Sequence, residues 1–186
     1  MPVIEVIGLN QAQGELLEIY TDLLAKRGKL ANVHQIQSLN PATIRSHMQL
    51  YMDIMFTSSP LKRATRELLA VVVSRTNNCN YCMQHHSEAL LAYWKDKGKL
   101  EKILDGQDLD ILDEKELSLA NLAIEMTRNP VSEEKDKINA SLKSLGFSDR
   151  AILDAHLVIA YFNFVNRLVL GLGVELEKEA GKGYNY

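Results

Sequence analysis

Apolar residues recur at intervals of three and four along most of the chain, which is the pattern of α-helices that bury one face. No segment alternates apolar and polar residues as a half-buried strand would. The sequence therefore predicts an all-α protein. Residues typical of helix starts and stops delimit the expected helices, which cover about residues 10–28, 40–57, 59–76, 78–98, 99–104, 113–128, 132–145 and 148–172.

The clearest boundary is a capping box formed by Asp113 and Glu116. Residues 68–73 are apolar on every side, which predicts a helix through the centre of the fold. The apolar run at 157–170 is shorter than the roughly 20 residues that a bilayer needs, so we expect a buried helix. The polar residues of this helix are expected to be hydrogen-bonded core or interface residues: His156, Asn163, Asn166 and Arg167. The polar tail after Gly173 is expected to fray.

Composition narrows the class of protein. A chain of 186 residues is most simply a single domain, 1–186, and its 10 Gly and 4 Pro are few enough to favour long helices. A net charge of -3 provides no basic field, so neither nucleic acid nor a membrane is expected as a partner. The N-terminal residues have no basic region and no long apolar run, which favours a cytoplasmic protein.

Cys79 and Cys82 stand three residues apart at a predicted helix start, and His86 follows one turn later on the same face. Positions three apart on a helix lie about 5–6 Å apart at Cα, so the pair can open and close a disulfide. The positive helix terminus stabilises a thiolate, and His86 can exchange a proton with Cys82. Because two cysteines are too few for a disulfide scaffold, a catalytic or metal-binding pair is favoured.

Other uses of these cysteines stay open at this point. They can be buried apolar residues, or they can bind zinc together with His85 or His86. A fourth zinc ligand would come from a carboxylate or from one of the remaining histidines: His34, His47 and His156. Haem attachment is excluded because Met83 stands where a c-type haem requires histidine, and a thioredoxin-like site lacks its strands.

Four residues reproduce a Glu-x(11)-Cys-x(2)-Cys-x(3)-His pattern: Glu67, Cys79, Cys82 and His86. In this pattern the sequence resembles the AhpD-like alkylhydroperoxidases of the carboxymuconolactone decarboxylase superfamily. The resemblance covers about residues 40–98, and residues 161–167 look like the peroxidase-related branch. Tyr81 departs from the pattern, since many relatives have histidine there. A tyrosine donates a hydrogen bond but, with a pKa near 10, is no base at neutral pH, so we treat Tyr81 as an auxiliary residue.

The resemblance implies a compact domain of about seven to eight helices in a homo-oligomer (dimer, trimer or hexamer), with neither a cofactor nor a metal. It implies that Cys82 is the peroxidatic thiolate, which becomes a sulfenic acid, and that Cys79 resolves it as a disulfide. Glu67 and His86 would relay protons. General thiol chemistry instead favours Cys79 as the more acidic thiol, because it is nearer the helix terminus, so the order of attack stays open.

The function expected from these residues is a thiol-dependent peroxidase that reduces small or organic hydroperoxides and is itself reduced by an unidentified dithiol. The alternative is a non-catalytic redox-sensing or zinc-binding helical protein that uses the same cysteines. Decarboxylase or lactone chemistry is a further alternative, although it does not need a dithiol. His85 points about 100° away from His86 around the helix, so we expect it to be a polar surface or subunit-contact residue.

Overall fold

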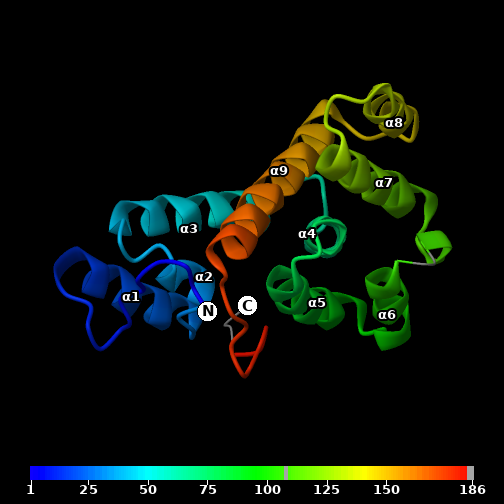
Figure 1. The fold of residues 1–186 in the computed structure, drawn as a ribbon. Coiled ribbons are helices and arrows are strands. Elements are labelled where there is room, and N and C mark those ends of the chain that lie inside the picture. Colours follow the sequence, from blue (N-terminus) through cyan, green and yellow to red (C-terminus); the bar gives the residue numbers. More distant parts are fainter. Residues whose placement is uncertain (107–108, 184–186) are drawn as a thin grey trace.

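The computed structural model describes residues 1–106 and 109–183 (Figure 1). Its helices are α1 Gly14–Arg27, α2 Asn32–Gln35, α3 Pro41–Phe56, α4 Arg63–Thr76, α5 Asn80–Trp94, α6 Lys97–Asp105, η1 Leu109–Ile111, α7 Glu114–Arg128, α8 Glu133–Ser144 and α9 Asp149–Leu172. No strand occurs in these two described ranges, so the all-α prediction is confirmed. The described residues form nine α-helices where seven or eight were expected, because the short α2 has no amphipathic pattern of its own.

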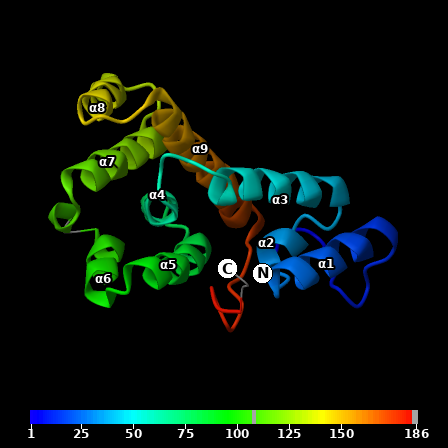
Figure 2. The ribbon, with the colours of Figure 1, turned by 180° about the vertical axis from the view of Figure 1, so that it is seen from behind.

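Helix α4 lies at the centre of the fold, as its apolar sequence predicts. It packs against α5, α7 and α9, and every residue from 66 to 74 is buried. Figures 1 and 2 show α9 running diagonally through the molecule, with α1 to α3 on one side and α4 to α8 on the other. The large core surrounds α4 and α9, and a smaller apolar cluster joins α1 to α3.

Helix α9 is the one described helix that is long and apolar enough to cross a membrane, with a mean hydropathy of 1.4 over its best window. Length and composition alone are weak evidence, since core helices pass the same test. Here 44% of that window is buried inside the fold, and α9 contacts α3, α4, α5, α7 and α8. The prediction that this segment is a buried helix agrees with that packing.

The capped helix starts are confirmed, whereas two other starts are wrong. Asp113 accepts a hydrogen bond from the Glu116 amide, and α7 begins at the next residue, Glu114. Helix α1 begins at Gly14 rather than near Asn10, because residues 8–12 close a separate turn. Helix α4 begins at Arg63 rather than beside Ser59 and Pro60. The Ser59 hydroxyl is 2.6 Å from Asp154 of α9 and accepts from the Leu61 amide, so it does not cap α4.

The predicted end of the cysteine-bearing helix at Gly98 is also wrong. Helix α5 ends at Trp94, because Lys95 adopts the left-handed conformation with φ of 54°. Asp96 then caps α6 by accepting from the Lys99 amide, which places Gly98 inside α6.

The C-terminal segment is ordered against the fold as far as residue 183, so the expectation of a frayed tail is wrong there; residues 184–186 lie outside the described part of the chain. The N-terminal segment lies close to the described part of the C-terminal tail in both views (Figures 1 and 2). The Val3 amide donates to the Leu172 carbonyl, and the N-terminal amine lies 2.7 Å from Glu175. After α9 the tail contacts α5, where Glu177 lies 2.9 Å from His85.

Candidate active site

The cysteine pair lies where the chain turns from α4 into α5. Asn78 makes this turn in the left-handed conformation with φ of 55°, and the Cys79 amide donates to the Ser74 carbonyl at 2.8 Å. The Asn77 side-chain amide donates to Asn166 of α9 at 3.1 Å. Backbone and side-chain hydrogen bonds thus fix the pair between α4, α5 and α9.

Glu67 faces this turn from α4 and is completely buried. Its carboxylate lies 2.7 Å from His86 Nδ1 and 2.6 Å from Arg63 Nη2. Burial raises the pKa of Glu67, but His86 and Arg63 together outweigh burial and hold it below the usual range. The ionised carboxylate accepts the Nδ1 proton of His86. In neutral His86 this leaves Nε2 as the basic nitrogen.

The two thiols are free and close enough to share a proton. The hydrogen bond from the Cys82 thiol lowers the pKa of Cys79, and the Cys82 backbone amide supports the same thiolate. That hydrogen bond and burial raise the pKa of Cys82 well above its usual range. The first thiolate of the pair therefore forms on Cys79, as the position nearer the helix terminus predicts.

The less acidic thiol, Cys82, is the one with access to a pocket. Cys82 lines a narrow pocket of about 70 Å³ together with His86, whereas Cys79 is fully buried and is absent from its lining. The pocket is walled by aromatic rings, among them Tyr51, Tyr161 and Phe162. A small molecule that enters it meets the sulfur of Cys82, not the more acidic Cys79.

Asn166 links the buried polar groups around the pair. Its side chain is fully buried, accepts from Asn77 and lies 3.3 Å from the Ser74 hydroxyl. A further hydrogen bond to Cys82 acts to lower the pKa of that thiol. The expectation of a hydrogen-bonded core residue is confirmed, and the contact with Cys82 is an addition that the sequence did not indicate.

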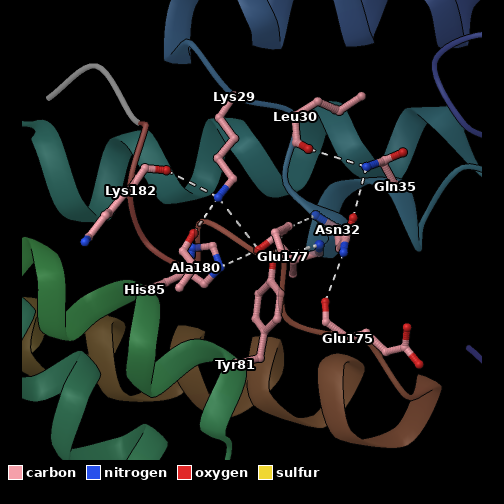
Figure 3. A network of polar contacts seen from close by, with 11 residues as sticks. Lys29, Leu30, Asn32, Gln35, Tyr81, His85, Glu175, Glu177, Ala180 and Lys182 are labelled. Atoms are coloured by element: carbon pink, nitrogen blue, oxygen red, sulfur yellow. Dashed lines mark hydrogen bonds and ion pairs between the residues drawn. The ribbon is translucent and has the colours of Figure 1, made fainter. Parts of the chain in front are cut away.

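Tyr81 and His85 are fixed by the tail rather than directed at solvent (Figure 3). The Tyr81 hydroxyl donates to Glu177 at 2.8 Å and accepts from the Val33 amide, and His85 Nε2 lies 2.9 Å from the same carboxylate. The Asn32 amide donates to Glu177 at 2.6 Å. His85 is buried within the chain, so the expectation of a surface or subunit-contact residue is wrong, because Glu177 covers it.

Glu177 should make the stability of the fold depend on pH in the acid range. Burial raises its pKa, but hydrogen bonds from His85, Asn32 and Tyr81 prevail and lower the pKa to about 2. A carboxyl whose folded pKa is lowered stabilises the fold above its unfolded pKa, and this contribution is lost as pH falls from about 4.5 to about 2.

We therefore expect Glu177→Gln to be less stable than the unmodified chain at pH 7, by roughly 2 kcal/mol after solvent screening. The difference should shrink as pH falls through this window, which urea unfolding at several pH values measures. A difference that stays constant down to pH 2 would contradict this account. The exposed Glu179→Gln, in the same tail, is the matched control.

The structure brings together Glu67, Cys79, Cys82 and His86, the four residues that the spacing singled out. Tyr81 lies beside them with its hydroxyl on Glu177. The described residues contain no group of three or more His, Cys, Asp or Glu side chains placed to hold a metal ion. The nearest histidines already have carboxylate partners, His86 with Glu67 and His85 with Glu177.

Several residues of the site were not predicted as such: Arg63, His47, Tyr161 and Glu177. Arg63 precedes Glu67 by one helical turn, and this i, i+4 spacing is a local signal for an ion pair. The others make their contacts at the site across sequence separations of about ninety residues or more, such as the 114 between His47 and Tyr161. No local sequence pattern predicts contacts between residues that are so far apart along the chain.

Comparison with known proteins agrees with the all-helical fold. Residues 41–110 match the model of the carboxymuconolactone decarboxylase family. An uncharacterized peroxidase-related protein from Silicibacter sp. TM1040 is 27% identical, with a TM-score of 0.82 over 97% of this chain and 96% of that chain. An AhpD-core, peroxidase-related protein from Ralstonia eutropha JMP134 is 20% identical, with a TM-score of 0.82 over 97% and 94% of the two chains.

A curated relative is longer than this protein. Sestrin-3 of Mus musculus is 21% identical over 183 residues, and these cover 97% of this chain but 36% of Sestrin-3. The chain thus spans about a third of that relative.

Fold and site together define a class: all-helical proteins that carry a cysteine pair at a helix start beside a buried Glu–His pair. The family match over residues 41–110 and the similar structures make the chain similar to the AhpD-like proteins of the carboxymuconolactone decarboxylase family.

Proposed function

We propose that the protein is a thiol-dependent peroxidase that reduces small or organic hydroperoxides through a dithiol/disulfide cycle of Cys79 and Cys82. The observation that carries this proposal is the bond of His86 Nδ1 to the buried Glu67, which leaves Nε2 as a base in the pocket that Cys82 lines. The family match over residues 41–110 and the similarity to peroxidase-related proteins support a general alkylhydroperoxidase-like role.

The first step oxidises Cys82. His86 Nε2 takes the thiol proton, and the thiolate attacks the terminal oxygen of the hydroperoxide R–O–O–H. The S–O bond forms as the O–O bond breaks, and the departing alkoxide takes the proton from His86 to become the alcohol. The products are ROH and the sulfenic acid of Cys82.

The second step uses the thiolate that the structure favours on Cys79. It attacks the sulfur of the sulfenic acid, so that the S–S bond forms, the S–O bond breaks and hydroxide leaves with a proton from solvent as water. An external dithiol then reduces the disulfide and is itself oxidised. Electrostatics and access are consistent with this order, because the more accessible thiol reacts first and the more acidic thiol resolves the product.

The test is consumption of cumene hydroperoxide and hydrogen peroxide by the full chain with excess dithiothreitol, with bound zinc measured on the same preparation. Many turnovers per chain are expected. Oxidation that stops at one equivalent in the presence of the dithiol would contradict the peroxidase proposal and favour a redox sensor. Stoichiometric zinc without turnover would favour the metal-binding alternative.

Cys79→Ser should separate the two steps. Cys82 is still the thiol that faces the pocket, so we expect one equivalent of hydroperoxide to be consumed and a stable sulfenic acid to form, without rapid turnover. Trapping with dimedone and mass spectrometry locates the oxidised residue. Undiminished turnover in this variant would show that Cys79 is not the resolving thiol.

A further inference from the structure

A second chain of hydrogen bonds reaches the pocket from the side opposite the Glu67–His86 pair. The side-chain nitrogen of Gln37 donates to the Val33 carbonyl at 2.8 Å and lies 2.8 Å from His47 Nδ1. Because a carbonyl only accepts, the Gln37 atom is its amide nitrogen, and His47 Nδ1 must accept from it. Neutral His47 therefore carries its proton on Nε2, which lies 2.7 Å from the Tyr161 hydroxyl.

This arrangement fixes the direction of the last hydrogen bond. His47 Nε2 donates to Tyr161, so Tyr161 keeps its own proton for another acceptor. Burial lowers the pKa of His47 to about 4, and burial raises the pKa of Tyr161 well above its usual value, so both groups are neutral at pH 7. Among the described residues His47 is the one hydrogen-bond partner of the Tyr161 hydroxyl.

Aromatic contacts hold the Tyr161 ring in the pocket that Cys82 also lines. It stacks on Tyr51 at a centroid distance of 5.8 Å and meets Phe162 edge-on at 5.1 Å. Tyr161 and Cys82 line the same pocket and are near enough for a charge on Cys82 to act on the phenol. A second buried polar atom of the pocket, His34 Nδ1, has no hydrogen-bond partner among the described residues.

Polar groups in apolar pockets are usually satisfied, so an unused donor next to a nucleophile indicates the place of a ligand atom. We propose that Tyr161, held by His47, donates a hydrogen bond to an oxygen atom of the substrate and so holds that atom beside Cys82. This inference rests on the proposed peroxidase function and adds to it a substrate-binding residue. His47 is a positioning residue, since it acts through Tyr161.

The chemistry of the donor defines the ligand that it recognises. Tyr161 and His47 are neutral, so they select an oxygen acceptor rather than a charge. The pocket of about 70 Å³ and its aromatic walls favour a compact molecule with an apolar group. A small alkyl hydroperoxide has this form, and its alcohol product retains the oxygen.

The test compares two reactions of Cys82 in a Cys79→Ser background, where oxidation stops at the sulfenic acid. One reagent is tert-butyl hydroperoxide, which offers oxygen acceptors. The other is dimethyl disulfide, in which the thiolate attacks sulfur, an S–S bond forms, another breaks and methanethiolate leaves without any oxygen. Tyr161→Phe removes the hydroxyl and keeps the ring.

We expect Tyr161→Phe to slow reaction with the hydroperoxide roughly tenfold to a hundredfold and to leave disulfide exchange unchanged, since loss of one hydrogen bond to an oxygen that becomes charged costs about that much. His47→Leu should shift the ratio of the two rates in the same direction. Tyr20→Phe is the matched control, because Tyr20 is a fully buried tyrosine whose hydroxyl donates to the Ile7 carbonyl, away from the pocket. The ratio of the two reaction rates should not change in this control.

Equal slowing of both reactions would place the effect on the thiol itself and overturn the inference, as would no slowing at all. If Cys82 of the unmodified chain reacts with no hydroperoxide, the proposed peroxidase function fails separately. In that case, binding of tert-butanol to the Cys82→Ser protein, measured by NMR, tests the Tyr161 donor independently of any peroxidase activity. Weaker binding when Tyr161→Phe is added supports the assigned donor, and binding equal to that of the Tyr20→Phe control overturns it.

Discussion

Cys82→Ser is expected to abolish peroxide consumption, a loss of at least about a thousandfold, while the helical fold is retained. The serine hydroxyl is almost never ionised at neutral pH and cannot replace the thiolate that is proposed to attack the peroxide. Cys79 remains in this variant, but it is fully buried and does not line the pocket, so no second thiol can take over. Steady-state peroxide consumption with dithiothreitol measures the loss.

The same variant decides which cysteine attacks first. If Cys79 were the attacking thiol, Cys82→Ser would still consume one equivalent of hydroperoxide and leave a sulfenic acid on Cys79. Cys79→Ser would then be inert. We expect the reverse for both variants. Circular dichroism and thermal unfolding of each variant show whether a loss of reactivity has a structural cause, since both cysteines belong to the large core cluster.

The sequence predicted the helix starts correctly where a side chain caps the helix. The side chains of Asp113, Ser132 and Ser148 each accept a hydrogen bond from an amide of the first helical turn, and each helix begins at the next residue. Ser59 has the same chemistry, yet its hydroxyl bonds to Asp154 of a distant helix and caps nothing. A local signal predicts a boundary only when no distant partner competes for the side chain.

The spacing of the cysteine motif could be interpreted from the sequence for a similar reason. Cys79, Cys82 and His86 lie on one helix, so their relative placement follows from helical geometry alone. Glu67 is on the preceding helix, and the short turn between the two helices places it next to His86. The contact between these two residues spans 19 positions, which makes it the longest connection among the four residues that the sequence pattern could identify.

The rest of the site depends on tertiary contacts that have no periodic pattern. Glu177 stands in a polar tail whose composition indicates fraying, and it is ordered because Tyr81, His85 and the Asn32 amide all bond to its carboxylate. Tyr161 belongs to an apolar run that reads as core packing. Its proposed role depends on the hydrogen bond between its hydroxyl and His47, which is far away in the sequence.

Glu67→Gln should lower kcat/KM for hydroperoxides by about a hundredfold or more, within the range of ~10²–10⁴ typical of general acid–base catalysis. The glutamine amide is uncharged, so it no longer stabilises the protonated imidazole that forms when His86 takes the Cys82 proton. It also offers a donor where the carboxylate only accepts, which lets His86 adopt the other tautomer. The base at Nε2 is then lost for part of the population.

The substitution is also expected to cost roughly 3 kcal/mol of stability, because Arg63 keeps its charge in a site that is 12% exposed. Kinetics are therefore measured at a temperature where the variant is folded. Glu101→Gln, on the exposed surface of α6, is the control for loss of a carboxylate and should match the unmodified chain in both properties. Glu67→Asp keeps the charge but shortens the side chain, so its activity should fall between that of the unmodified chain and that of Glu67→Gln. An unchanged kcat/KM in folded Glu67→Gln would remove Glu67 from the proton relay and leave it a structural partner of Arg63.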